Sequence, residues 1–431
     1  MSSTPEQEAP TARQALETQK RNFRTVQIDA IGVGLAGASG PYLPVFLTLL
    51  GATATQIGLL TTMPGITGLL FALPVGQFLQ SRRNVVPWFS ISRLLVLSAY
   101  AATGLVPFFL PDDKVVIAVL LIWAAVTLPQ TMVAVAFSVV MNAVAGPQRR
   151  YELMSRRWST LGLTSAITVA LAGQVLDRIN FPINYQVVFL ALSVGGLISY
   201  YFSSRIQIPD SDLTQRTQRL PIRQRISHTF REYAELVRHE PSFISFSIRR
   251  FVFLSGVTLA APIFPLYYVR EVQASNAWIG IITTTATAFA LVGYTFWTRQ
   301  SRLHGSRRVL LLTTLGTALF PALVASTHQV WLIAIFAATA GIFQAGLDLV
   351  FFDELMKTVP IKYSATFVSL AQSMQYLSTI LSPLIGTWIA DHVSLTAALL
   401  TSAAIRLIGF GLFALQGRQP IREEEEDLVQ V

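Results

Sequence analysis

The chain has 431 residues, of which 52% are hydrophobic and only 13% charged, and its mean hydropathy is +0.52. Charged residues are about half as frequent as in soluble proteins, which excludes an ordinary soluble domain. The net charge of +9 comes from residues scattered between apolar segments, so no nucleic-acid surface is expected. The chain has no cysteine, which excludes disulfides, thiolate chemistry and cysteine metal sites.

Twelve apolar segments reach the roughly 20 residues that a membrane-crossing helix needs. They are predicted at residues 26–50, 56–80, 85–109, 115–141, 158–177, 185–203, 243–268, 276–298, 308–326, 329–352, 364–390 and 394–416. A polar tail of residues 1–24 precedes them, and residues 418–431 form an acidic tail, expected to be disordered. The first segment is long and lacks a small-residue cleavage site, so we predict a retained helix and not a signal peptide.

The distribution of basic residues predicts the topology. With the N-terminus inside, 25 Lys and Arg fall on cytoplasmic segments and only 3 on the opposite side. Basic residues concentrate in cytoplasmic loops of membrane proteins. We therefore expect a multi-pass protein of the cell (plasma or inner) membrane with both termini in the cytoplasm.

A repeated motif divides the chain into two halves. Pro41-Tyr42-Leu43-Pro44 recurs as Pro262-Ile263-Phe264-Pro265, at an offset of 221 residues. Self-similarity at half the chain length indicates a duplicated unit. We predict bundles at residues 25–204 and 241–417, joined by a cytoplasmic linker at 205–240. Apolar residues at helical spacing in 221–240 predict a helix there, either bound to anionic headgroups or a partner, or simply joining the halves.

Six helices, a basic linker, six more helices and a half-to-half repeat together resemble the major facilitator superfamily of secondary transporters. In that family a loop of the type Gly-x-x-x-Asp-Arg-x-Gly-Arg-Arg follows the second helix of each half. Here Gly76 precedes Arg82 and Arg83, and Gly305 precedes Arg307 and Arg308, which the resemblance assigns to gating. Gln80 and Arg302 occupy the acidic slots, so the family's charge relay is not expected in that form.

The resemblance implies an all-α fold of twelve transmembrane helices in two pseudo-symmetric six-helix bundles. It also implies that the first, fourth, seventh and tenth helices line a central cavity. Drug exporters of the family often carry an arginine in the fourth helix and a Gly-Pro-rich fifth helix, and both features are absent here. The sequence therefore does not support drug export.

Polar side chains at mid-membrane on these helices are the candidates for substrate contact. Gln130 and Gln344 stand 214 residues apart, close to the repeat offset, and an unpaired amide in lipid costs several kcal/mol. Each should face the cavity and meet substrate, or else join helices by hydrogen bonds. The other candidate substrate residues are Ser39, Tyr42, Thr258, Gln372 and Tyr376.

The repeated prolines are predicted to kink the first and seventh helices because each removes a backbone hydrogen bond. Pro41, Pro44, Pro262 and Pro265 are either hinges of an outer gate or static bends.

Charges inside the membrane are the sharpest functional markers. Asp348 could be protonated reversibly during transport, or could form a structural ion pair with Arg249 or Arg250. Asp29 is the second candidate for proton coupling, and its counterpart at the repeat offset is Arg250, which suggests a latch between the halves. Arg93 and Arg406 are interpreted as structural, capped by neighbouring carbonyls or carboxylates.

These patterns predict a secondary active transporter of a small solute, expected to be proton-coupled and to work as a monomer by alternating access. An uncoupled facilitator is the first alternative, and a non-transporting assembly factor or sensor is the second. The chain has no Walker loop, no metal-ligand spacing and no nucleophile–base pair, so an enzyme, a cofactor and a metal are not expected. The expected partners are a small-molecule substrate, the lipid bilayer and protons, but no nucleic acid.

Overall fold

The structure, a computed structural model, describes residues 12–208, 240–358 and 364–415. It is all-helical, as predicted. The first half contains α1 (Ala12–Gly37), α2 (Tyr42–Leu49), α3 (Ala54–Gln80), α4 (Val86–Phe109), α5 (Asp112–Arg178) and α6 (Ile183–Ser203). The second half contains α8 (Pro241–Ala260), α9 (Ile263–Arg270), α10 (Asn276–His304), α11 (Ser306–Ala325), α12 (Val330–Thr358), α13 (Ser364–His392) and α14 (Leu395–Ala414). Most of the predicted linker helix and the acidic tail lie outside the described residues.

Within this part of the chain, 11 helical segments are long and apolar enough to cross a membrane. They coincide with eleven of the twelve predicted segments. The remaining prediction, 364–390, corresponds to α13, a helix of 29 residues that is long enough but more polar. Glutamines and serines of α13, Gln372 and Gln375 among them, lower its hydropathy, and two of them line the cavity described below.

The fourth and fifth predicted segments both belong to α5, which runs for 67 residues. This helix cannot be straight. The guanidinium of Arg157 lies 4.7 Å from the ring centre of Phe137, whereas 20 residues of straight helix would separate them by about 30 Å. The chain therefore reverses direction inside α5, and its two arms pack as neighbours in one bundle.

The first helix begins earlier than predicted. α1 starts at Ala12, within the polar tail expected at residues 1–24. Side chains of its first turns bond to distant segments: Gln19 Nε2 donates to the carbonyl of Ala145 at 3.1 Å, and Asn22 Oδ1 accepts from the amide of Gln207 at 3.0 Å. These contacts let polar residues continue the helix beyond the apolar segment.

The predicted proline kinks are helix breaks. α1 ends at Gly37 and α2 begins at Tyr42 after Pro41, while α8 ends at Ala260 and α9 begins at Ile263 after Pro262. Proline lacks the amide that would continue the hydrogen-bond ladder, which explains the break at equivalent places in both halves.

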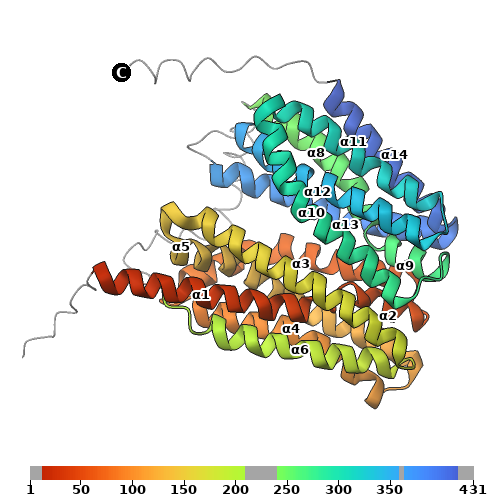
Figure 1. Cartoon of the computed structure of the whole chain (residues 1–431), viewed down its shortest axis with the longest axis horizontal. Coiled ribbons are helices and arrows are strands. Elements are labelled where there is room, and N and C mark those ends of the chain that lie inside the picture. The colour runs from red at the N-terminus through yellow and green to blue at the C-terminus, as the bar shows by residue number, and fades with distance from the viewer. Residues whose placement is uncertain (1–11, 209–239, 359–363, 416–431) are drawn as a thin grey trace, which may run out of the picture.

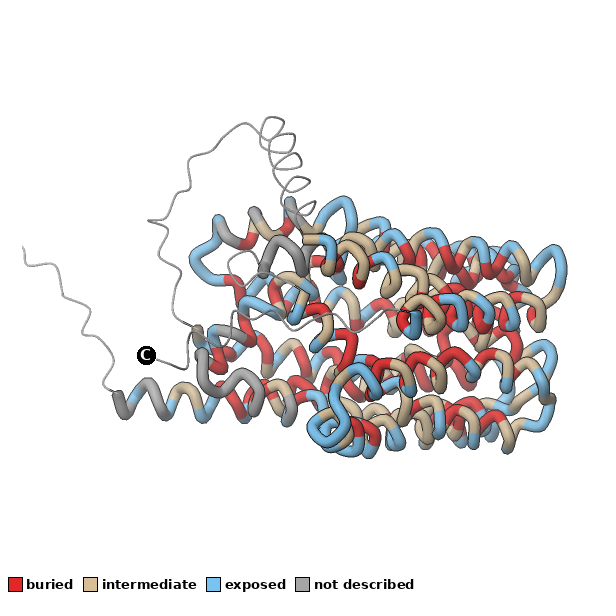
Figure 2. The backbone as a smooth tube through the Cα atoms, turned by 90° about the horizontal axis from the view of Figure 1, so that it is seen from above, coloured by how far each residue is buried: buried red, intermediate tan, exposed pale blue. Residues whose placement is uncertain are grey.

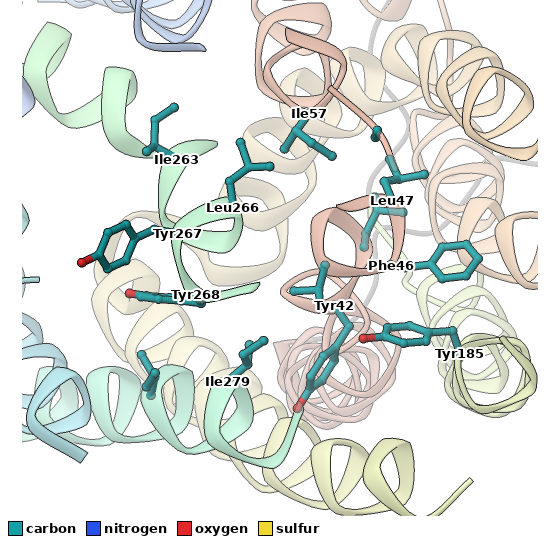
Figure 3. Close-up of a cluster of buried hydrophobic side chains, with 14 of the residues drawn as sticks. Tyr42, Phe46, Leu47, Ile57, Tyr185, Ile263, Leu266, Tyr267, Tyr268 and Ile279 are labelled. Atoms are coloured by element: carbon teal, nitrogen blue, oxygen red, sulfur yellow. The ribbon is translucent and has the colours of Figure 1, made fainter. Parts of the chain in front are cut away.

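The buried cores show how the halves meet. One core cluster contains residues of both halves, including Tyr42, Phe46, Tyr185, Ile263 and Tyr267, around α2 and α9 (Figure 3). Two further clusters belong to single halves, one around Phe89 and Val140 and one around Phe253 and Phe351. In Figure 1 the halves correspondingly meet near α2 and α9 and separate toward the opposite end, where α5 reverses. We call the joined end the closed end and the other the open end.

Buried and exposed residues lie on different faces of the helices. Figure 2 shows buried residues concentrated between helices, with exposed residues on the outer faces and at the helix ends. Many exposed side chains are large and apolar, such as Leu121, Leu171, Phe296 and Trp388. An outer surface of this kind suits lipid and not water.

Candidate functional site

A cavity of about 290 Å³ lies in the second half, toward the open end, between α8, α12 and α13. It is lined by Arg250, Leu254, Gln344, Leu347, Asp348, Phe351, Phe352, Leu355, Ala371, Gln372 and Gln375. Helical spacing brings its polar groups together, because Gln344 and Asp348 are four residues apart and Gln372 and Gln375 three apart. Four residues predicted to be functional, Arg250, Gln344, Asp348 and Gln372, therefore share one cavity.

The cavity carries two opposite charges that do not pair with each other. Asp348 accepts hydrogen bonds from Gln344 Nε2 at 2.8 Å and from the Tyr294 hydroxyl at 3.1 Å. Arg250 Nη2 donates to Gln375 Oε1 at 2.9 Å, and its buried Nε has no partner. Among the described residues no ion pair forms between Asp348 and either Arg249 or Arg250. The structural ion pair considered from the sequence is thus not formed.

Apolar side chains also line the cavity. Leu254, Leu347 and Phe351 line it, and the guanidinium carbon of Arg250 lies 6.0 Å from the ring centre of Phe351. This distance is at the limit for a cation–π contact.

Asp29, the other predicted coupling residue, has a different environment. It is fully buried and accepts from Arg93 Nη1 at 2.6 and 2.8 Å and from the Ser199 hydroxyl at 2.6 Å, with Arg157 at 3.7 Å. The predicted latch between Asp29 and Arg250 is not formed in this structure, because each residue is held within its own half. A carboxylate buried at 0% exposure needs such partners to offset its desolvation.

The two arginines interpreted as structural make contacts of the expected kind. Arg93 pairs with Asp29, and Arg406 Nη1 donates to the carbonyl of Thr317 at 2.9 Å. Both are almost completely buried.

Two carboxylates join the halves at the closed end. Asp177, at the end of α5, accepts from the backbone amides of Asn276 and Ala277 at the start of α10, both at 2.9 Å. Asp391, near the end of α13, accepts from the amides of Ala54 and Thr55 at the start of α3, both at 3.2 Å. Each acid thus caps a helix of the other half, where backbone amides lack helical partners and the dipole favours negative charge. We call these two contacts the end caps.

Tyr42 seals the same end. It is fully buried, its hydroxyl donates to the carbonyl of Val169 at 2.7 Å, and it lies against Gly173 and Gly280 at the α5–α10 seam. Figure 3 shows its ring directed toward the α10 side of the cluster, with Tyr185 beside it. Ser39 is also fully buried. Neither residue lines the cavity, so the structure places both at the closed end, away from the site predicted for substrate contact.

The other predicted substrate residues are dispersed. Gln130 is exposed and does not line the cavity. The Thr258 and Ser378 hydroxyls lie 3.0 Å apart and join α8 to α13. Tyr376 packs against Gly68 at the α3–α13 seam, where an added Cβ on the glycine would approach its ring to 2.9 Å.

The predicted gating loops lie at the open end. Arg82 stacks on Phe78 at 4.3 Å, while Gly305 adopts φ +81 between α10 and α11, a conformation that favours glycine. Arg83 is exposed on the loop after α3, and Arg307 and Arg308 are exposed in the first turn of α11. Beside them, Glu354 Oε1 of α12 accepts from the Ser306 hydroxyl at 2.5 Å.

Sequence reasoning missed four polar residues of these sites: Tyr294, Gln375, Asp177 and Asp391. The two acids are 214 residues apart, the same spacing as Gln130 and Gln344, and their partners Ala54 and Asn276 are 222 apart. The repeat therefore held the signal for the end caps. Tyr294 and Gln375 carried no such signal, since their roles depend on which helix faces which.

Comparison with known proteins agrees with this architecture. Residues 246–429 match the family model of the Major Facilitator Superfamily. The chain is similar to the multidrug resistance protein MdtG of Proteus mirabilis (strain HI4320), with 26% identity over 161 residues, 36% of this chain and 40% of that protein. The match thus spans less than half the length of this relative.

Solved structures match over nearly the whole chain. A bacterial homologue of the iron transporter ferroportin in an inward-facing state has a TM-score of 0.69 at 13% identity, covering 93% of this chain and 98% of that one. The xylose transporter XylE from E. coli in an inward open conformation has a TM-score of 0.65 at 11% identity, covering 96% and 99%. The second half of the chain thus matches the model of the Major Facilitator Superfamily, and both halves share the fold of solved membrane transporters.

Proposed function

We propose that this protein moves a small solute across the cytoplasmic membrane by alternating access, with the cavity of α8, α12 and α13 as the solute site. One observation carries the proposal: a polar cavity lies at the open end, whereas a shared core and the two end caps close the opposite end. A solute can then enter from one side only, until the halves rock and exchange the open and closed ends.

The distribution of basic residues supports a cytoplasmic location for the open end, since the loops carrying Arg82 and Arg307 lie there. The state described would then be inward-facing, with both termini in the cytoplasm and a monomer as the working unit. The two solved structures compared above are in inward-facing and inward open states, which agrees with this orientation.

The cavity also supports a small solute over a bulky one. Its volume of about 290 Å³ is at the lower end of the roughly 300–1,000 Å³ typical of ligand pockets. The relative from Proteus is named for multidrug resistance, and the solved structures for iron and xylose transport. Such different cargoes on one fold mean that the side chains of this cavity, and not the fold, select the solute.

Asp348 is our candidate for proton coupling. It is exposed to the open end, and its two hydrogen-bond donors, Gln344 and Tyr294, belong to α12 and α10. Protonation would weaken both bonds and change how these helices hold together, which is what a coupling residue must do. Asp29 is the less favoured candidate because Arg93, Arg157 and Ser199 already surround it.

Purified protein in liposomes loaded with a pH-sensitive dye tests the proposal. A panel of amino acids, sugars and nucleosides is added outside at a fixed pH gradient, and a coupled transporter should move protons with at least one of them. Asp348→Asn should abolish this flux, while exchange of labelled against unlabelled solute should persist at a saturating solute concentration. Asp353→Asn, an exposed acid on the same helix outside the cavity, is the matched control.

Exchange without proton flux in the unmodified protein would favour an uncoupled facilitator. If no solute exchanges at all, the proposal of transport is wrong.

A further inference from the structure

We infer that the cavity takes a zwitterionic solute about the size of an amino acid, its ammonium group bound to Asp348 and its acidic group bound to Arg250. The inference rests on the proposed function and names the substrate class of the same site.

The first step is the charge pattern of the cavity wall. The cavity presents one carboxylate and one guanidinium, each held by neutral side chains and not by the other. The buried Nε of Arg250 has no partner at all. Neither charge is neutralised by an opposite charge of the protein, so a ligand that brings a complement to each would form two charge-assisted contacts.

The second step excludes ligands of a single charge. A cation would be attracted by Asp348 but repelled by Arg250 in the same cavity. An anion would be attracted by Arg250 but repelled by Asp348. Like charges that share one small cavity repel each other. A neutral solute would leave both charges without a complement. Only a solute that carries both a positive and a negative charge complements both Asp348 and Arg250.

The third step concerns the rest of the wall. The carboxamides of Gln344, Gln372 and Gln375 offer donors and acceptors between the two charged groups. Leu254, Leu347 and Phe351 provide an apolar surface on which a short hydrocarbon side chain would pack. A cavity of about 290 Å³ lined by one acidic, one basic and several apolar side chains matches an amino acid with an apolar side chain.

The first half shows that these charges are not a general need of the fold. Asp29 stands at the position equivalent to Arg250, and its charge is neutralised by Arg93 within its own half. The second half instead leaves Arg250 facing the cavity. The two copies of the repeat thus differ at the point where the ligand would bind.

Three matched probes test the inference on the purified full-length protein: leucine, leucine methyl ester, which keeps only the positive charge, and N-acetyl-leucine, which keeps only the negative charge. Affinity is measured by isothermal titration, with thermal unfolding as a check. Leucine should bind at least about tenfold more tightly than either derivative, because each loses one charge-assisted contact. Equal or tighter binding of one derivative, or no binding of leucine, would overturn the inference.

The variants assign each charge to its residue. Asp348→Asn should lower the affinity for leucine and leave the affinity for N-acetyl-leucine unchanged or higher. Arg250→Gln should also lower the affinity for leucine, and should leave the affinity for leucine methyl ester unchanged or higher. Asp353→Asn and Arg249→Gln, outside the cavity, are the matched controls and should bind as the unmodified protein does. Arg250→Lys keeps the charge and should retain the preference for leucine, which separates a binding role from a folding defect.

The failure of this inference can be distinguished from the failure of the proposed function. If leucine does not bind but spin-label distances show that the two halves alternate, only the proposed substrate class is wrong. If the halves do not alternate, the proposed function itself fails, whatever binds in the cavity.

Discussion

Replacing the two acids of the end caps should open the closed end. Asp177 and Asp391 each accept two backbone amides at the first turn of a helix in the other half, at 2.9 and 3.2 Å. Asparagine keeps one acceptor oxygen but loses the charge and the second oxygen. The double variant Asp177→Asn/Asp391→Asn therefore weakens both contacts with little change of shape.

The magnitude follows from the capping geometry. A helix cap contributes about 0.5–2 kcal/mol, and a charge near a helix end about 0.3–1 kcal/mol. With one acceptor kept, each substitution should cost about 1 kcal/mol. The two acids lie on different seams, so their effects should add to about 2 kcal/mol, which shifts the ratio of open to closed roughly 30-fold.

The assay is a distance measurement between spin labels at the closed end. The chain has no cysteine, so Lys114→Cys and Gln329→Cys would be the only labelled sites. Lys114 is exposed in the first turn of α5, and Gln329 is exposed on the loop before α12 in the other half. The double variant should gain a population at longer distance, and the single variants a smaller one. In the unmodified protein, high salt should also populate the longer distance, because it screens the exposed charges of the two acids. Glu271→Gln, an exposed acid at the same end without a partner across the seam, should change nothing. An unchanged distribution in the double variant would refute the reasoning.

Two further predictions concern packing and buried charge. Gly173→Ala would place a Cβ 2.7 Å from the carbonyl oxygen of Asn276 and 2.7 Å from the Tyr42 hydroxyl, so it should force the closed end apart in the same distance measurement. Gly162→Ala, on the same helix but 3.8 Å from its nearest neighbour, should not, and equal effects would contradict the packing account. Asp29→Asn leaves Arg93 and Arg157 without a counter-charge and should cost about 3–5 kcal/mol, seen as a lower unfolding temperature. Asp29→Asn/Arg93→Gln should recover part of that loss, and a double variant no more stable than the single one would count against the ion pair.

Much of the fold could be predicted because the forces that set it act locally. Apolar length predicts where helices cross, and proline predicts where they break, so Pro41 and Pro262 marked the breaks correctly. The reversal within α5 was predicted as two separate crossing segments, but the early start of α1 was missed because it depends on contacts between distant residues, such as Gln19 with Ala145.

The site was predicted less completely for the same reason. Arg250, Gln344, Asp348 and Gln372 could be selected because polar groups at membrane depth are unusual. Their partners, and the burial of Tyr42 and Asp29, depend on the rotation of each helix about its axis. Sequence spacing gives the face that a residue occupies but not the neighbour that this face meets.

The claim that the two ends open in alternation is tested most directly by measuring both ends in the same preparation. A second label pair, Arg83→Cys and Leu303→Cys, reports the open end, and the two pairs are compared in lipid bilayers with and without the double substitution of the end caps. The account predicts that the closed-end distance lengthens while the open-end distance shortens, in the same fraction of molecules. Lengthening at one end with no change at the other would contradict it.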